Sequence, residues 1–115
     1  MLVGAHYDHL GKHGSDTFYG ADDNAAAVAI LVEVGRALAT RPPEGRSVLL
    51  AAFDCEEPPH FCSEAMGSAH FVAHPTIPLQ EIDLMVCMDL VGHAVGSERA
   101  PAEVRQTRLS GEAQF

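Results

Sequence analysis

The chain has 115 residues, of which 47% are hydrophobic, and a formal net charge of −9 at pH 7. This length suits one small domain, and the apolar fraction is high enough to form a core, which excludes a disordered chain. The acidic balance argues against a nucleic-acid partner. The sequence shows neither an apolar run long enough to span a bilayer nor a signal-peptide pattern, so no membrane partner is expected.

The first half of the chain predicts a strand, a helix and a second strand. Residues 2–5 are an apolar segment that predicts a buried strand, and the Gly-, Ser- and Asp-rich residues 11–20 predict a loop. Residues 24–39 carry apolar side chains at helical spacing, and two prolines that follow end this helix. Residues 46–54 are mostly apolar, which is typical of a strand covered on both faces.

The second half adds a helix and a third strand. Residues 63–73 predict a short helix and residues 82–90 a strand, after which the pattern weakens. This alternation predicts an α/β fold of three layers, α/β/α, with a mainly parallel central sheet. We expect residues 1–92 to form the core of one domain and residues 93–115 to be a poorly defined tail. Because three strands make a thin sheet, the domain is expected to be incomplete and truncated at both ends.

Acidic side chains and one histidine stand at the ends of the predicted strands and at the start of the first helix: His6, Asp8, Asp22, Asp23, Asp54, Glu56, Glu57 and Asp89. In parallel α/β sheets the carboxyl ends of the strands meet at one edge, where ligands bind. Carboxylates gathered there repel one another unless a cation neutralises them. Three carboxylates with one histidine suit zinc, cobalt or manganese.

Each part of this pattern also has an ordinary structural explanation. Asp22 and Asp23 can cap a helix and interact with its dipole, and adjacent glutamates are typical of a solvated loop. Asp89 at the end of an apolar strand can equally be structural, and a single His-x-Asp motif is weak evidence of a site. The ordered occurrence of all four features at equivalent strand ends favours one shared site.

Four motifs occur in order between residues 3 and 92: Val-Gly-Ala-His6-Tyr-Asp8, Gly20-Ala-Asp-Asp23-Asn-Ala, Phe53-Asp-Cys-Glu56-Glu57 and Met88-Asp89-Leu-Val-Gly. Together they resemble the di-zinc aminopeptidase family, metallopeptidase family twenty-eight. The resemblance implies a zinc-exopeptidase-like α/β fold with two zinc ions in each complete site. One departure is the pair Ala26-Ala27, where the family usually has serine and glycine.

The resemblance implies four metal ligands in this chain. Asp23 would bridge the two zinc ions, and the peptide bond that follows it is often cis in the family. His6 and Asp89 would complete the first zinc site, and Glu57 would bind the second zinc. The family takes a further histidine from a loop well beyond this chain, and His93 does not match it.

The resemblance also implies the reaction, which is hydrolysis of the N-terminal peptide bond of a substrate with a free amino terminus. Glu56 would be the general base, and Asp8 would orient the histidine ligand. His60, which lies near Glu56 in the sequence, is a candidate for lining the substrate pocket. Family members are often exported, so the parent protein is a candidate for export as well.

Two alternatives remain open from the sequence. A chain that lacks one family ligand can be a metal-binding remnant without catalytic activity. A related co-catalytic zinc carboxypeptidase or deacylase would share the order of histidine and carboxylates. The Gly-Ala-Asp-Asp-Asn start of the first helix favours an aminopeptidase over a carboxypeptidase or deacylase.

Overall fold

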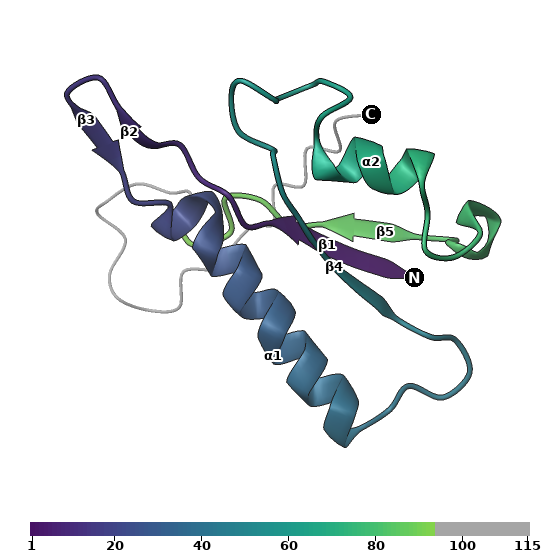
Figure 1. Cartoon of the computed structure of the whole chain (residues 1–115). Coiled ribbons are helices and arrows are strands. Elements are labelled where there is room, and N and C mark those ends of the chain that lie inside the picture. The colour runs from purple at the N-terminus through teal and green to yellow at the C-terminus, as the bar shows by residue number, and fades with distance from the viewer. Residues whose placement is uncertain (94–115) are drawn as a thin grey trace, which may run out of the picture.

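Strand β1 (Leu2–His6) is the centre of the main sheet in the computed structural model, which describes residues 1–93 (Figure 1). All five of its residues are buried, as expected of an apolar segment covered on both faces. Strand β4 (Leu49–Phe53) pairs with one side of β1 and strand β5 (Met85–Cys87) with the other, and both pairs are parallel. The predicted parallel sheet is therefore confirmed, in the order β4-β1-β5.

Helix α1 (Ala26–Thr40) covers one face of this sheet and forms the core with it. Val3 and Ala5 of β1 pack against Ala27 and Leu31 of the helix, and all four side chains are buried. This contact explains why the apolar residues of the helix recur at helical spacing. The π-helical turn η1 (Ala21–Ala25) precedes α1 and carries the Asp-Asp-Asn segment.

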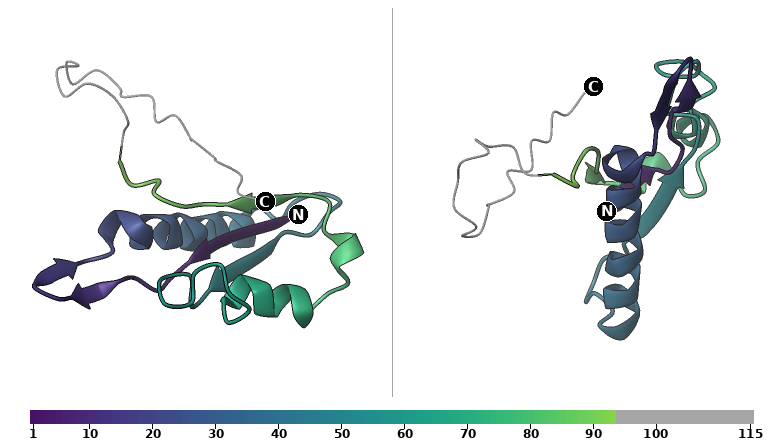
Figure 2. Two further views of the ribbon diagram at one scale, coloured as in Figure 1. Left: turned by 90° about the horizontal axis from the view of Figure 1, so that it is seen from above. Right: turned by 90° about the vertical axis from the view of Figure 1, so that its left-hand side faces the viewer.

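Helix α2 (Gly67–Ala73) lies on the opposite face, so that the two helices enclose the sheet (Figure 2). The Phe71 ring meets the Phe53 ring edge to face, with centroids 6.0 Å apart. Leu50, three residues before Phe53 in β4, points to the opposite face of the sheet and packs against the core on the α1 side. The predicted three-layer architecture is therefore present among the described residues.

Three local predictions differ from the structure. Residues 11–20, predicted as a loop, contain a hairpin of β2 (Gly11–His13) and β3 (Asp16–Phe18). These strands have three residues each and are largely exposed, so no apolar alternation marks them in the sequence. The second and third strands of the main sheet are shorter than predicted. The helix predicted from residue 63 begins at Gly67, after a series of turns, and the 3-10 turn η2 (Leu79–Glu81) precedes β5.

The two outer strands leave apolar side chains open to solvent. Leu84, Met85 and Val86 are exposed at the β5 side of the sheet. Within residues 1–93, no helix is both long enough and apolar enough to cross a membrane. The predicted tail lies outside the described residues except for His93, and the boundary predicted at residue 92 stays a prediction.

Candidate metal centre

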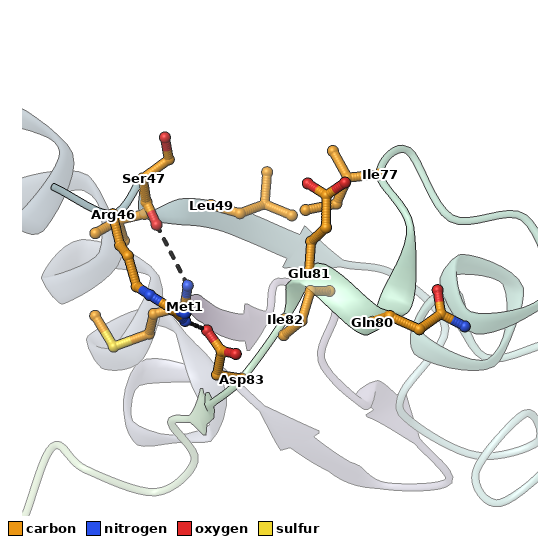
Figure 3. Close-up of a pocket in the computed structure, with 10 residues that line it drawn as sticks. Met1, Arg46, Ser47, Leu49, Ile77, Gln80, Glu81, Ile82 and Asp83 are labelled. Carbon is orange, nitrogen blue, oxygen red and sulfur yellow. Dashed lines mark hydrogen bonds and ion pairs between the residues drawn. The ribbon is translucent and has the colours of Figure 1, made fainter.

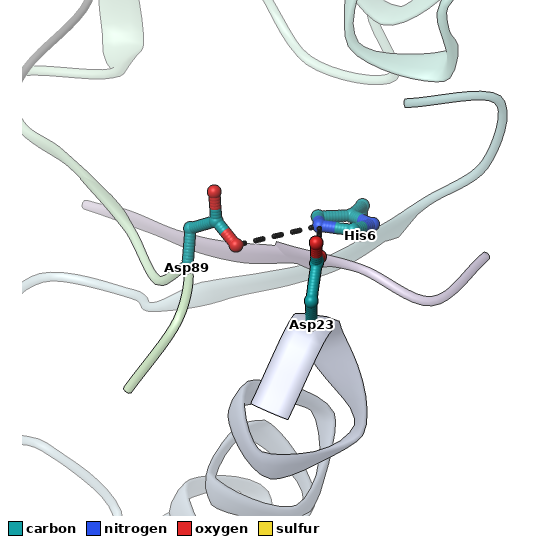
Figure 4. A group of neighbouring side chains, drawn as sticks. All are labelled: His6, Asp23 and Asp89. Atoms are coloured by element: carbon teal, nitrogen blue, oxygen red, sulfur yellow. Dashed lines mark ion pairs between the residues drawn. The ribbon is translucent and has the colours of Figure 1, made fainter. Parts of the chain in front are cut away.

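The last residue of β1, the turn before α1 and the segment after β5 meet at the carboxyl edge of the sheet. The Nε2 atom of His6 lies 3.2 Å from an Asp23 carboxylate oxygen and 3.5 Å from an Asp89 carboxylate oxygen (Figure 4). One possible ligand atom from each of these three residues lies within 4.8 Å of the others. Segments far apart in the sequence therefore bring one imidazole and two carboxylates to a single point.

The two glutamates that follow β4 approach the same point. Glu56 Oε2 lies 3.7 Å from His6 Nε2. Glu57 has a buried Oε1 atom that has no hydrogen-bond partner among the described residues. Cys55, just before them, has a left-handed backbone conformation with φ of 57°, which turns the chain sharply after the strand.

Asp8 connects the end of β1 to the loop that carries both glutamates. Its carboxylate accepts hydrogen bonds from the backbone N–H groups of Glu56, at 3.1 Å, and Glu57, at 3.0 Å. His6 Nδ1 lies 3.2 Å from the Asp8 carbonyl oxygen and 3.5 Å from its carboxylate. Asp8 thus contacts the histidine ring and also fixes the backbone of the two glutamates. The sequence does not indicate these hydrogen bonds to the glutamate backbone.

The backbone on the C-terminal side of Asp23 is held from within the protein. The peptide bond between Asp23 and Asn24 is cis, as the family resemblance implies. The Asn24 side chain is only 1% exposed and donates a hydrogen bond of 2.9 Å to the carbonyl oxygen of Met88. Asn24 is a site-supporting residue that the sequence pattern alone does not reveal, because amides at helix starts are common.

Other residues considered from the sequence lie apart from this cluster. His60 is exposed in the loop after Glu57, and no hydrogen bond or ion pair of its ring joins it to the site. His93 contacts the carboxylate of Asp22 and lies outside the three-residue group. Asp54 accepts a hydrogen bond from the backbone N–H of Cys55.

The clustered charges shift the protonation of the site. Burial lowers the pKa of His6, but the carboxylates of Glu56, Asp89, Asp23 and Asp8 outweigh it, so the pKa is raised above 6.5. Burial is the main cause of the raised pKa values of three carboxyl groups: Asp23, Glu56 and Glu57.

Asp8 behaves differently from these three carboxyl groups. Burial alone would raise its pKa, yet the N–H groups of Glu57 and Glu56 stabilise the carboxylate and lower its pKa overall. Asp8 therefore stays ionised beside carboxyl groups that bind protons more readily.

Four buried atoms at the site or next to it have no hydrogen-bond partner among the described residues: His6 Nε2, Asp23 Oδ1, Asn24 Oδ1 and Glu57 Oε1. Unpaired buried polar atoms cost free energy unless a ligand satisfies them. One imidazole nitrogen with carboxylate oxygens is a donor set that zinc accepts. The residues present therefore fit a zinc-type cation.

A separate hollow lies at the other end of the sheet, near the start of β1 and β4 (Figure 3). Arg46 forms an ion pair with Asp83 there, and the amino group of Met1 donates to the carbonyl oxygen of Ser47 at 3.3 Å. Ligands of parallel α/β sheets bind at the carboxyl ends of the strands. The metal-binding residues lie at that end and not at this hollow.

A parallel α/β sheet that gathers a histidine and carboxylates at its carboxyl edge is an arrangement that can hold a metal ion. The chain matches the family described as Peptidase family M28 over residues 1–111, and it belongs to that family. The predicted family is therefore confirmed, and this family is one of zinc-dependent peptidases.

A relative from Escherichia coli (strain K12), described as "Uncharacterized protein YfbL", is 38% identical over 107 residues. The match covers 88% of this chain and 32% of the relative, so the chain spans about a third of that relative's length. No solved structure matches the chain.

Proposed function

We propose that the carboxyl edge of the sheet is a zinc centre that hydrolyses the N-terminal peptide bond of peptides. The observation that carries this proposal is the buried Nε2 atom of His6, which makes ion-pair contacts with Asp23 and Asp89 but has no hydrogen-bond partner of suitable geometry among residues 1–93. An imidazole nitrogen that faces two carboxylates is a common arrangement at a metal site.

His6, Asp23 and Asp89 would hold one zinc ion, and Asp23 with Glu57 would hold a second. The charge of Asp23 contributes to the raised pKa of Glu57, which indicates that these two carboxylates lie near each other. In this arrangement Asp23 would bridge the two zinc ions. Bound zinc would lower the pKa of a water molecule and polarise the carbonyl group of a substrate.

Glu56 would act as the general base. Its Oε2 atom lies 3.7 Å from His6 Nε2, and Glu56 does not belong to the three-residue ligand group, so its carboxylate would be free to act on a water molecule. It would take a proton from the water that attacks the peptide carbonyl carbon and then deliver this proton to the leaving amine as the carbon–nitrogen bond breaks. Burial raises its pKa, which brings the proton affinity of the carboxylate nearer to neutral pH.

The surplus of carboxylates would select the substrate. The site carries five acidic side chains against one histidine: Asp8, Asp23, Glu56, Glu57 and Asp89. Two zinc ions would leave residual negative charge around them, which favours the positively charged amino terminus of a peptide. This charge balance supports aminopeptidase activity over the binding of a substrate's terminal carboxylate.

One observation favours a second candidate, a single-zinc centre without catalytic activity. The compact ligand group contains His6, Asp23 and Asp89, whereas Glu57 lies outside it. The first position therefore has three ligands among the described residues, and the second position has fewer. The number of zinc ions per chain and the activity separate the two candidates.

The test measures zinc per folded chain by elemental analysis, together with aminopeptidase activity. We expect about two zinc ions in the wild type, none in Asp23→Ala, and wild-type zinc content in Glu56→Gln. Activity of Glu56→Gln should fall roughly 10²–10⁴-fold, because a general base contributes this much. Glu33→Gln, an exposed charge change on α1, is the control and should match the wild type.

Each other outcome has a definite meaning. One zinc ion and no activity would favour the single-zinc candidate. Full activity in Glu56→Gln would remove Glu56 from the mechanism. A wild-type chain that takes up no zinc would refute a metal centre in this chain.

A further inference from the structure

Asp22 lies next to the proposed bridging ligand, but its carboxylate is used differently. One oxygen accepts a hydrogen bond of 2.6 Å from the backbone N–H of Gly92, and the other contacts the imidazole of His93. Asp22 does not belong to the group of possible metal ligands. Its side chain therefore joins the turn before α1 to the segment that follows β5.

Asn24, on the other side of Asp23, joins the same two segments. Its buried amide donates to the carbonyl oxygen of Met88, the residue just before Asp89. The two neighbours of Asp23 thus hold the chain on both sides of Asp89. We call these two links, Asp22 to Gly92 and Asn24 to Met88, the clasp.

Gly92 is packed too closely for any side chain. A Cβ atom at this position would lie 2.6 Å from an Asp22 carboxylate oxygen and 2.9 Å from the Cβ of Ala26. Because both contacts are shorter than normal packing allows, a larger residue would force the two segments apart. The close approach of the two segments therefore depends on both a carboxylate at position 22 and a glycine at position 92.

Apart from the clasp, one backbone hydrogen bond holds the segment that carries Asp89, from the N–H of Met88 to the carbonyl oxygen of Gly4 at 2.9 Å. The Asp89 side chain is 51% exposed, and Leu90 is half exposed. Met88 and Val91 are partly buried against the core and fix the depth of the segment. The links to Asp22 and Asn24 fix its position along the edge of the sheet.

We propose that Asp22 is a positioning residue, which fixes the Asp89 segment relative to Asp23 so that both carboxylates reach one metal ion. This inference rests on the proposed zinc centre. It adds that the ligand geometry is set before metal binding by a carboxylate that does not touch the metal. Residues that orient ligands in this way typically contribute about 10–100-fold to metal affinity.

The test compares three variants of the full chain by competition with a chromogenic zinc chelator. Asp22→Ala removes both contacts and should weaken zinc binding by about 10–100-fold. Asp22→Asn removes the charge but keeps an oxygen that can accept from Gly92, so its affinity should stay within about threefold of the wild type. Asp16→Ala, which removes an exposed charge from the hairpin, is the control and should bind as the wild type does.

A second variant and a second measurement guard against a variant that fails to fold. Gly92→Ala leaves every charge in place and should weaken zinc binding as Asp22→Ala does, because its Cβ pushes the same segments apart. In the metal-free chain, the Gly92 amide proton should resonate downfield in the wild type and in Asp22→Asn. It should move upfield in Asp22→Ala, where its acceptor is gone.

Two affinity results would overturn the proposal while leaving the zinc centre intact. Asp22→Ala with wild-type affinity would show that Asp22 positions nothing. Equal weakening in Asp22→Ala and Asp22→Asn would show that only its charge matters. If the wild type binds no zinc, the proposed function fails. The chemical shift of the Gly92 amide proton in the metal-free chain then tests whether Asp22 positions the segment. An unchanged Gly92 resonance in Asp22→Ala overturns the positioning role, and the upfield shift supports it.

Discussion

Replacement of Asp8 should reduce the stability of the metal-free protein as well as disturb the site. The Asp8 carboxylate accepts two backbone N–H groups, from Glu56 and Glu57, and its side chain is 20% exposed. Asp8→Ala leaves both N–H groups without their acceptor. Asp8→Asn keeps one acceptor oxygen and presents an NH₂ group where the other oxygen was.

The expected magnitudes follow from this difference. A hydrogen bond to a charged group contributes about 1.5–3 kcal/mol, and the lower end applies to a partly exposed carboxylate. Asp8→Ala should therefore lower the free energy of unfolding by about 3 kcal/mol, and Asp8→Asn by about 1.5 kcal/mol. With a urea dependence of about 1–3 kcal/mol per molar, Asp8→Ala should lower the midpoint by roughly 1–3 M.

Urea denaturation followed by far-UV circular dichroism, with a chelator present at pH 7, measures these changes. Asp16→Asn is the control, because Asp16 is exposed on β3, and it should stay within about 0.5 kcal/mol of the wild type. Equal losses in Asp8→Asn and Asp8→Ala would show that the negative charge, and not the pair of hydrogen bonds, stabilises the fold. No loss in either variant would refute the reasoning about the loop.

The same experiment has a defined pH dependence. The pKa of Asp8 in the folded protein lies below its usual value of 3.8. A depressed carboxyl pKa contributes stability that is present above the unfolded value and is lost as the pH falls through the folded value. The difference between the wild type and Asp8→Ala should therefore be constant near neutral pH and should shrink below about pH 4.

Two further predictions concern the metal and the core. Zinc affinity should fall by about tenfold per pH unit below the raised pKa of His6, because zinc must displace the imidazole proton. Chelator competition between pH 5.5 and 8 measures this dependence. An affinity independent of pH would exclude His6 as a ligand. Leu31→Ala should cost about 2–5 kcal/mol of unfolding free energy because Leu31 is buried in the core, whereas Val32→Ala, at an exposed position of the same helix, should stay within about 0.5 kcal/mol. Similar urea midpoints for these two variants would contradict the described packing of α1.

The sheet and its main helix could be predicted because their sequence patterns are strong. The apolar segments at β1 and β4 and the helical spacing of α1 are long enough to outweigh local preferences. The β2–β3 hairpin could not be predicted in this way. Its strands are short and exposed, and the turn between them depends on Gly14 with φ of +62°, a conformation that composition does not specify.

The convergence of the site residues follows from parallel topology, because strands that run in one direction end at one edge. The contacts that orient these residues do not follow from it. The bonds from Glu56 and Glu57 to Asp8 depend on how the backbone turns at Cys55, and the Asn24 contact joins residues that are 64 positions apart in the sequence. Sequence patterns predict which residues meet. The hydrogen bonds that support them can be predicted only once the path of the backbone is known.

The central position of β1 also sets the order of assembly during synthesis. Leu2 pairs with Leu49 on one side and with Met85 on the other, so β1 is synthesised well before either of its partners. Until those partners emerge, β1 exposes apolar residues and an unpaired backbone on both edges. The three-residue metal group is therefore complete only after residue 89 has been translated, when Asp89 can meet His6.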